Sequence, residues 1–468
     1  MRMSRKKKNI IHEQVEITAF ASEGKSLTRV DDKVVFVPFT APGDVVDLRV
    51  TRNKKAFAEA VATNFYTYSS LREEPKCSHF GTCGGCKWQH VRYEEQLKSK
   101  QQQVVDHLTR IGNLDVPKCL PIIACEETYF YRNKLEFTFT DKKWLTIEEI
   151  RSGEEIDRQG VGFHVPGGFD KVIDLEKCYL QKDPSNQIRD FIGAYGKEHE
   201  LSFYNIRENE GLLRNLIIRS TNTGDLMVIV QFGEQNDVIE ALMEALKVKF
   251  PEITSLLYII NLKKNETYFD QEVICYSGKP FIMEKLGDLS FKINPKSFFQ
   301  TNSSQAEKLY EAAVKLAGLK KEDVVYDLYT GTGTIANFIA RNVQKVIGIE
   351  YVEEAIVDAK ENSKINNISN TTFFAGDMKD VLNDTFIKDH GAPNVIITDP
   401  PRAGMHPDVI ETIKKTAPQR IVYVSCNVAT QARDLALLAD DYDVTAIQPV
   451  DMFPQTHHVE NIVALIKK

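Results

Sequence analysis

A glycine-rich turn at residues 327–333, Asp-Leu-Tyr-Thr-Gly-Thr-Gly, constrains the fold of this chain more than any other feature. It follows a short apolar run, and from about residue 291 onward such runs alternate with amphipathic stretches of helix length. This alternation predicts a doubly wound parallel α/β sheet, in which ligands bind beyond the carboxyl ends of the strands. Its first helix is expected to begin with a capping box at Ser304 to Glu307 and to end at Gly318. The residues that close the predicted strands are candidate ligand-binding groups: Glu350, Gly376, Asp377, Asp399 and Ser425.

The glycine turn alone does not identify the ligand. Gly331-x-Gly333-x-x-Ala336, with Glu350 about 20 residues further on, also fits the dinucleotide fingerprint of a dehydrogenase. Cys426 follows an apolar run at the end of a predicted strand, where a thiol is more often a small buried apolar group than a nucleophile. A thiol has no evident role in hydride transfer, whereas a thiolate beside a sulfonium methyl donor makes a coherent chemistry.

The cysteines form a cluster and not the framework of a secreted disulfide protein. Cys77, Cys83 and Cys86 are spaced C-x5-C-x2-C, and the glycines among them permit the tight turns that a small inorganic centre requires. The spacing leaves two centres equally open: zinc, completed by His79 or a distant cysteine, and an iron–sulfur cluster completed by a distant cysteine. We expect Cys178 to be the fourth ligand, and a structural role for the centre.

The remaining sequence divides into three further segments. Residues 1–68 carry short alternating runs separated by Gly and Pro, which predicts a small antiparallel barrel of the OB-like kind that either binds single-stranded RNA or only supports the enzyme. Residues 93–119 hold a helix that is expected to pack on the catalytic domain, and 69–92 with 120–290 form a β-rich central domain. That domain includes a hairpin turning at Asn222 to Gly224. Residues 291–468 are the predicted sheet domain.

Rings and bases interleave at Tyr129-Phe130-Tyr131-Arg132-Asn133-Lys134 in the central domain. This mixture is typical of a groove that stacks unpaired nucleotides, although most such mixtures are ordinary surface. His457 and His458 are adjacent, and because neighbouring side chains of a strand point to opposite faces, we assign them no metal.

Composition excludes several classes of protein. A net charge of −7 argues against a protein that coats nucleic acid without specificity, although residues 1–60 hold 12 Lys and Arg against 8 Asp and Glu. The basic start, Arg5 to Lys8, lacks the apolar core of a signal peptide, and no later stretch has the roughly 18 apolar residues of a membrane span. We therefore expect a cytoplasmic protein, and a monomer.

Six motifs follow one another along nearly the whole chain. They are the cysteine block 77–86 with Cys178, Asn294-Pro295-x-x-Phe298-x-Gln300, the turn at 327–333, Asp399-Pro400-Pro401-Arg402-x-Gly404, Ser425-Cys426-Asn427, and the segment Met452 to Glu460. Together they resemble the S-adenosylmethionine-dependent RNA (uracil-5-)-methyltransferases, especially the ribosomal-RNA branch with an N-terminal TRAM barrel and a 4Fe–4S cluster. A set of six ordered motifs is far more specific than any one of them.

The resemblance implies a role for each matching residue. S-adenosylmethionine would be bound by Gln300, Tyr329, Glu350 and Asp399, with Asp377 at the adenine, and Cys426 would be the nucleophile with Glu460 as the base. Arg402 and Gln300 would hold a uracil flipped out of a single-stranded loop, and the resemblance points to 23S ribosomal RNA. The resemblance also favours iron–sulfur over zinc for Cys77, Cys83, Cys86 and Cys178.

Two other functions fit parts of this pattern. A cytosine-5 RNA methyltransferase needs the same thiol attack, and a non-catalytic, metal-tethered RNA-binding protein would retain the sheet without cofactor binding. An amino-group methyltransferase is disfavoured because those enzymes place an aromatic ring after the Pro-Pro pair, where this chain has Arg402.

Overall fold

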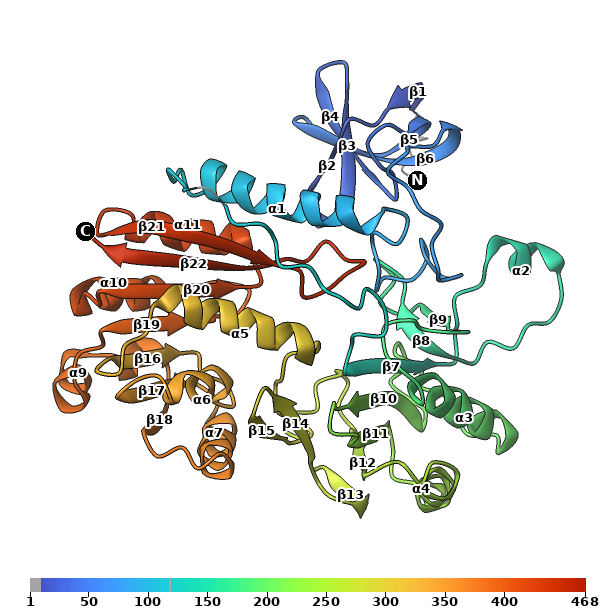
Figure 1. Ribbon diagram of the computed structural model, residues 1–468. Helices are drawn as coiled ribbons and strands as arrows, with labels where there is room; N and C mark the ends of the chain where they lie inside the picture. Colours follow the sequence, from blue (N-terminus) through green and yellow to red (C-terminus); the bar gives the residue numbers. More distant parts are fainter. Residues whose placement is uncertain (1–9, 118) are drawn as a thin grey trace, which may run out of the picture.

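A computed structural model describes residues 10–117 and 119–468. The basic segment Arg5 to Lys8 lies outside the described residues. The described residues form three large β-sheets and a two-stranded hairpin sheet. A long helix, α1 (Tyr93–Arg110), follows the first sheet in sequence and lies between the N-terminal strands and the C-terminal sheet in space (Figure 1). Among the residues that the structure describes, no helix combines the length and the apolar character needed to cross a bilayer.

The N-terminal sheet is a small barrel. Its strands are β1 (Ile11–Glu16), β2 (Ala19–Phe20), β3 (Lys25–Val30), β4 (Lys33–Pro38), β5 (Val45–Asn53) and β6 (Phe57–Thr67), with a short 3-10 helix, η1 (Ser22–Gly24). The strand order is β1-β5-β6-β4-β3-β2, so the two edges are consecutive in the chain and the sheet curls onto itself. The barrel is antiparallel as predicted except at one pair of strands: β6, which pairs antiparallel with β5, also runs parallel to β4 on its other side.

The central sheet has the order β13-β12-β11-β10-β7-β8-β9. Its strands are β7 (Lys134–Thr140), β8 (Gly160–His164), β9 (Val172–Asp174), β10 (Leu213–Ser220), β11 (Leu226–Phe232), β12 (Ser255–Ile260) and β13 (Ile274–Gly278). The predicted hairpin is confirmed, since β10 and β11 pair antiparallel up to Ser220 and Leu226. The helices of this region are α2 (Ile147–Ser152), α3 (Ser185–Glu198) and α4 (Val238–Lys249).

A hairpin of β14 (Ile282–Leu286) and β15 (Leu289–Ile293) leads into the C-terminal sheet. That sheet contains β16 (Val324–Leu328), β17 (Lys345–Glu350), β18 (Thr371–Ala375), β19 (Val395–Thr398), β20 (Arg420–Ser425), β21 (Tyr442–Val450) and β22 (Glu460–Lys467), in the order β18-β17-β16-β19-β20-β22-β21. The strands from β16 to β20 are parallel as predicted, but β22 runs antiparallel to both neighbours. A short loop, 451–459, joins β21 to β22 without a helix, and parallel strands require a longer crossover.

Helices cover both faces of this sheet (Figure 1). They are α5 (Ser303–Ala317), α6 (Thr334–Ala340), α7 (Glu353–Ile365), α8 (Met378–Val381), α9 (Asp384–His390), α10 (Pro407–Thr416) and α11 (Val428–Leu438). The predicted capping box at Ser304 was wrong: Asn302 caps α5 by accepting a hydrogen bond from the backbone N of Gln305, whereas Gly318 ends the helix as predicted. Helix α1 lies against α11 and β21, so it joins the N-terminal half to the C-terminal sheet.

Candidate active site

The glycine turn opens a space at the carboxyl end of β16. Gly331 and Gly333 have φ of +54° and +76°, which favours glycine. A Cβ on Gly333 would lie 2.9 Å from the Cβ of Ala359, whereas a Cβ on Gly331 would meet nothing within 4 Å. Close packing therefore requires glycine at 333, while open space beside Gly331 can receive a ligand.

Glu350, at the end of β17, fastens this turn. Its carboxylate accepts hydrogen bonds from the backbone N of Gly331 at 3.1 Å and from that of Val352 at 3.0 Å. A partly exposed carboxylate beside the turn is the group that ribose hydroxyls require. Glu350 thus combines a structural contact with a position suited to a nucleoside.

Tyr329 and Asp377 lie on the same side of the turn. Asp377 caps α8 and pairs with Lys379 at 3.1 Å, and this hydrogen bond lowers the pKa of Asp377. Burial, together with the negative charges of Asp377 and Glu350, raises the pKa of Tyr329 to about 12. The structure therefore brings Tyr329, Glu350 and Asp377 together at the ends of β16, β17 and β18.

Cys426 follows β20 and lies opposite Glu460. Ser425 of β20 pairs with Asn461 of β22 in an antiparallel register. The same register, continued by one residue, places Cys426 across from Glu460. The thiol is partly exposed. Burial raises its pKa to about 11, the carboxylates of Glu460 and Asp399 add to this, and Arg402 opposes it.

Glu460 is the first residue of β22 and is only 4% exposed. Burial raises the pKa of its carboxyl group to about 8, with a further increase from Asp399 and a decrease from Arg402. A carboxyl group with this pKa is a stronger base than an ordinary Glu and can take up a proton near neutral pH. Cys426, Glu460 and Asp399 are therefore brought together.

Two further acidic groups and a tyrosine lie in this region: Asp327 is fully buried, and Asp399 is partly exposed. Burial raises the pKa of Asp327 and of Asp399 to about 7. Thr330 donates a 2.5 Å hydrogen bond to Asp327 Oδ2, while Oδ1 of Asp327 is buried without a partner among the described residues. Burial also raises the pKa of Tyr310, to which Asp399, Glu460 and Asp327 contribute.

Sequence reasoning missed Asp327 and Tyr310 as site residues. Asp327 begins the glycine-turn motif, a signal that could have identified it, but Tyr310 lies on the apolar stripe of α5, which looks like ordinary core. Gln300 lowers the pKa of Tyr310, whereas Asp399, Glu460 and Asp327 raise it, so Tyr310 lies near both Gln300 and these carboxyl groups.

Arg402 is exposed at the loop after β19. Its Nη2 lies 3.3 Å from His458 Nδ1, and Asn427 donates a 2.9 Å hydrogen bond to its carbonyl oxygen. The expectation that His457 and His458 lie in a strand was wrong: both belong to the loop before β22, and their ring centroids are 4.1 Å apart. They face each other, since a loop imposes no alternation.

The cysteine segments lie side by side although they are remote in sequence. Cys77 Sγ lies 4.0 Å from the carbonyl oxygen of Lys177, and Glu176 donates a 2.9 Å backbone hydrogen bond to His79 Nε2. Burial raises the pKa of Cys86 to about 12 and of Cys178 to about 11, and each is raised further by other thiols of the set. As the side chains stand, the described ranges contain no group of three or more His, Cys, Asp or Glu that could hold a metal ion.

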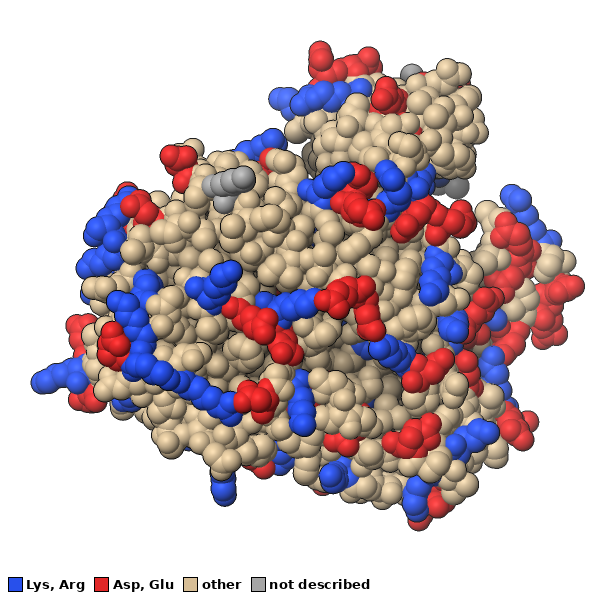
Figure 2. Space-filling model, viewed as in Figure 1, with Lys and Arg blue, Asp and Glu red and all other residues tan. Residues whose placement is uncertain are grey.

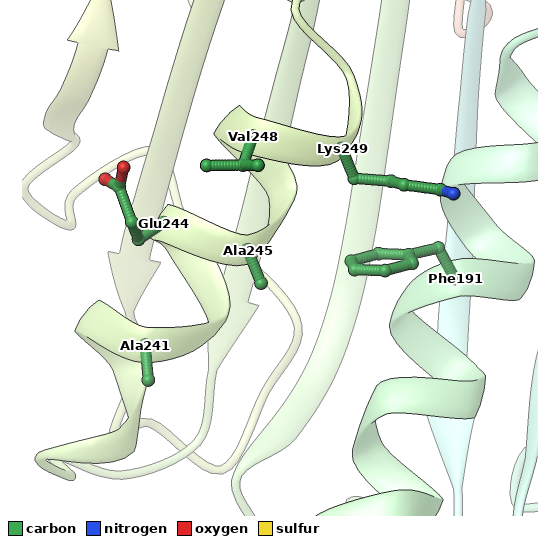
Figure 3. A pocket seen from close by; sticks show the side chains of 6 residues that line it. All are labelled: Phe191, Ala241, Glu244, Ala245, Val248 and Lys249. Carbon is green, nitrogen blue, oxygen red and sulfur yellow. The ribbon is translucent and has the colours of Figure 1, made fainter.

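The surface offers other features that carry none of these residues. A depression between α3 and α4 is lined by Phe191, Ala241, Glu244, Ala245, Val248 and Lys249 (Figure 3). On the face shown in Figure 2, basic and acidic side chains are interspersed, and acidic groups gather over α2. We therefore do not expect α2 to contact a polyanion.

Two family models match this chain. The model of tRNA (uracil-5-)-methyltransferase matches residues 218–468, and that of the TRAM domain of tRNA (uracil(54)-C(5))-methyltransferase matches residues 2–70. The first match includes every residue of the candidate active site.

Relatives of nearly equal length extend the similarity to the whole chain. An uncharacterized RNA methyltransferase of Bacteroides thetaiotaomicron is 56% identical over 95% of this chain and 99% of its own, and one of Porphyromonas gingivalis is 53% identical over 97% and 99%. The structure of Pyrococcus abyssi tRNA (uracil-54, C5)-methyltransferase in complex with S-adenosyl-L-homocysteine is also similar. It has a TM-score of 0.74 and 29% identity, over 97% of this chain and all of that one.

Proposed function

The chain belongs to the family of S-adenosylmethionine-dependent RNA (uracil-5-)-methyltransferases, and from this premise we propose that it methylates uridine through a transient bond between Cys426 and C6 of the base. The observation that carries the proposal is the register of β20 and β22, which brings Cys426 and Glu460 to opposing positions. A nucleophile and a base must reach the same ring, and these two side chains lie at the same end of the sheet as the glycine turn.

The residues divide the chemistry between them. Uracil C5 is too poor a nucleophile to attack a methyl group unaided. The thiolate of Cys426 adds to C6, which makes C5 enolate-like and able to form the new carbon–carbon bond. Glu460 then removes the C5 proton, the electrons of the C5–H bond restore the double bond, and the C6–S bond breaks to release the thiolate. Arg402 favours the thiolate by lowering the pKa of Cys426.

The chain's groups fit the methyl donor. S-adenosylmethionine supplies the methyl group from its sulfonium. Glu350 and Asp377 are partly exposed at successive strand ends, where they suit the ribose and the adenine, and the open space beside Gly331 leaves room for them. Gln300, Tyr329 and Asp399 are the remaining residues that we assign to it.

We also propose that Cys77, Cys83, Cys86 and Cys178 hold a 4Fe–4S cluster. The donor set supports this, because hydrogen bonds join the two segments that carry the four thiols, and Cys77, Cys83 and Cys178 all raise the pKa of Cys86. Four cysteine thiolates are the ligand set that such a cluster would require. The cluster would act as a structural tie between residues 77–86 and Cys178.

The substrate is proposed to be a uridine in a single-stranded loop of 23S ribosomal RNA, where unstacking the base costs least. The barrel, residues 1–68, and the central domain, 69–92 with 120–290, would hold the flanking strand, while 93–119 joins them to the catalytic domain, 291–468. A second candidate is transfer RNA, since the similar Pyrococcus abyssi enzyme is a tRNA (uracil-54, C5)-methyltransferase.

One experiment tests the chemistry and the substrate together. Purified protein is incubated with labelled S-adenosylmethionine and either unmodified 23S ribosomal RNA or unmodified transfer RNA, and the nucleosides are identified by mass spectrometry. We expect 5-methyluridine in the ribosomal RNA alone, and no product from Cys426→Ala. Label in transfer RNA alone would show that transfer RNA, and not ribosomal RNA, is the substrate. A 5-methylcytidine product would show that the target base is cytosine. A fully active Cys426→Ala variant would reject the covalent mechanism.

A further inference from the structure

The segment 130–133 connects the central sheet to both loops of the active site. Its backbone pairs with the residues that follow Cys178: Phe130 N donates to Tyr179 O and Arg132 N to Leu180 O, each at 2.7 Å. The backbone N of Ser220 donates to the carbonyl of Asn133 at 2.9 Å. These bonds hold the segment, which we call the strap, at the start of β7.

Tyr131 reaches the loop that precedes Glu460. Its side chain is 6% exposed, and its hydroxyl donates a buried 2.9 Å hydrogen bond to the carbonyl oxygen of Pro454. The neighbouring Arg132 guanidinium lies 5.2 Å from the ring centroid of Phe453. Two consecutive side chains of the strap therefore hold consecutive residues of the 451–459 loop.

Asn133 reaches the loop that carries Gln300. Its side-chain Nδ2 donates to the carbonyl oxygen of Gln300 at 2.9 Å and to Ser303 Oγ at 2.8 Å. Its backbone N donates to the carbonyl oxygen of Thr301 at 2.8 Å. Ser303 in turn donates to the fully buried Glu284 at 2.7 Å, so the amide of Asn133 has no freedom to turn away.

We propose that Tyr131 and Asn133 are positioning residues, Tyr131 for the base Glu460 and Asn133 for the cofactor-binding Gln300, an inference that rests on the proposed roles of those two groups. The burial of Tyr131 also argues against the sequence-based interpretation of 129–134 as a stacking groove, because this ring is not presented to RNA. The two variants should therefore fail at different steps.

Tyr131→Phe keeps the ring and removes one hydrogen bond to the loop of Glu460. We expect kcat to fall about tenfold, in line with one lost hydrogen bond, and a covalent protein–RNA adduct to accumulate during turnover because release of the thiolate is slowed. The affinity for S-adenosylhomocysteine, measured by calorimetry without RNA, should stay unchanged.

Asn133→Ala should give the opposite result. S-adenosylhomocysteine should bind about tenfold more weakly, and no adduct should accumulate. Asn133→Asp, which keeps the shape and loses the donor, serves if the alanine variant melts below the assay temperature. Tyr129→Phe, in the same segment but partly exposed, should behave as wild type in both assays.

The outcomes separate this inference from the proposed function. If Tyr131→Phe and Asn133→Ala change only RNA affinity, or if both lower both readouts equally, the assignment of separate positioning roles is wrong. If Glu460→Gln fails to accumulate an adduct, the covalent mechanism itself fails. An adduct in Glu460→Gln without one in Tyr131→Phe overturns only the role of Tyr131.

Discussion

Cys426 and Glu460 stand across from each other at the ends of β20 and β22, one step beyond the Ser425–Asn461 pair. Glu460 affects the protonation of its neighbour, since its carboxylate contributes to the raised pKa of the Cys426 thiol. The nucleophile and the base are therefore electrostatically coupled. Substitution of Glu460 should expose the adduct that Cys426 forms, and substitution of Cys426 should abolish that adduct.

Glu460→Gln should trap the enzyme on its substrate. The amide cannot accept the C5 proton, so the thiolate is not released, and a denaturation-resistant protein–RNA band should accumulate in the presence of S-adenosylmethionine. The rate of multiple-turnover methylation should fall by about 100-fold or more. The double variant Cys426→Ala/Glu460→Gln is the control, and a band that persists in it would show that the bond does not involve Cys426.

Arg402→Met should slow formation of the adduct at neutral pH. Arg402 lowers the pKa of Cys426, so its removal raises that pKa further above the value of about 11 and leaves less thiolate. Single-turnover rates in the Glu460→Gln background should fall severalfold at pH 7.5 and approach the parent rate as the pH rises. Arg402→Lys keeps the positive charge, so its single-turnover rate should fall less. If the rates of Arg402→Met and Arg402→Lys fell equally at every pH, Arg402 would act through a contact with RNA instead.

Stability should depend on pH through Glu460. Its pKa is raised from 4.5 to about 8, so the folded protein keeps a proton that the unfolded chain releases. The stabilisation by the protonated Glu460 is fully present below pH 4.5 and is lost as the pH rises from there through about 8. Each unit of difference between the folded and unfolded pKa corresponds to about 1.4 kcal/mol of stability. The melting temperature of Glu460→Gln should therefore fall less than that of wild type between pH 5 and 9. Parallel curves for the two proteins would contradict the raised pKa.

The buried pair of Lys100 and Asp451 should contribute strongly to stability. Lys100 Nζ lies 2.6 Å from Asp451 Oδ1, and both side chains are fully buried. Lys100→Met leaves the carboxylate without its cation, which should lower the free energy of unfolding by about 3–5 kcal/mol in thermal denaturation. Lys98→Met breaks an exposed pair with Glu95 on the same helix and should cost less than about 1 kcal/mol. If the two variants lost similar amounts of unfolding free energy, burial would not be what makes the Lys100–Asp451 pair important.

Iron content should depend on Cys178. Protein purified without air should be brown and contain about four irons per chain if a 4Fe–4S cluster is present, and Cys178→Ser should lose most of that iron and melt at a lower temperature. Cys275→Ser removes an exposed thiol and should change neither. A colourless, iron-free wild-type preparation would overturn the cluster assignment.

Much of the fold and of the candidate site was predictable because strand ends and turns leave local signals. The glycine turn, the polar residues after each apolar run and the β10–β11 hairpin all depend on near neighbours in sequence. The capping residue of α5 and the parallel pairing of β4 with β6 were mispredicted. In each case the sequence offers more than one candidate, two possible capping residues or several possible partner strands, and neighbouring residues alone do not select between them.

The sequence alone shows which chemical groups are present: a thiol at 426 after an apolar run, a carboxyl group at 460 and a glycine-rich turn at 327–333. It does not show that β22 enters the sheet antiparallel beside β20, that burial raises the pKa of Glu460 to about 8, or that Tyr131 turns inward to Pro454; these features appear only in the folded chain. Strand pairing and burial depend on segments that meet only when the chain has folded, and no local pattern records which segments those are.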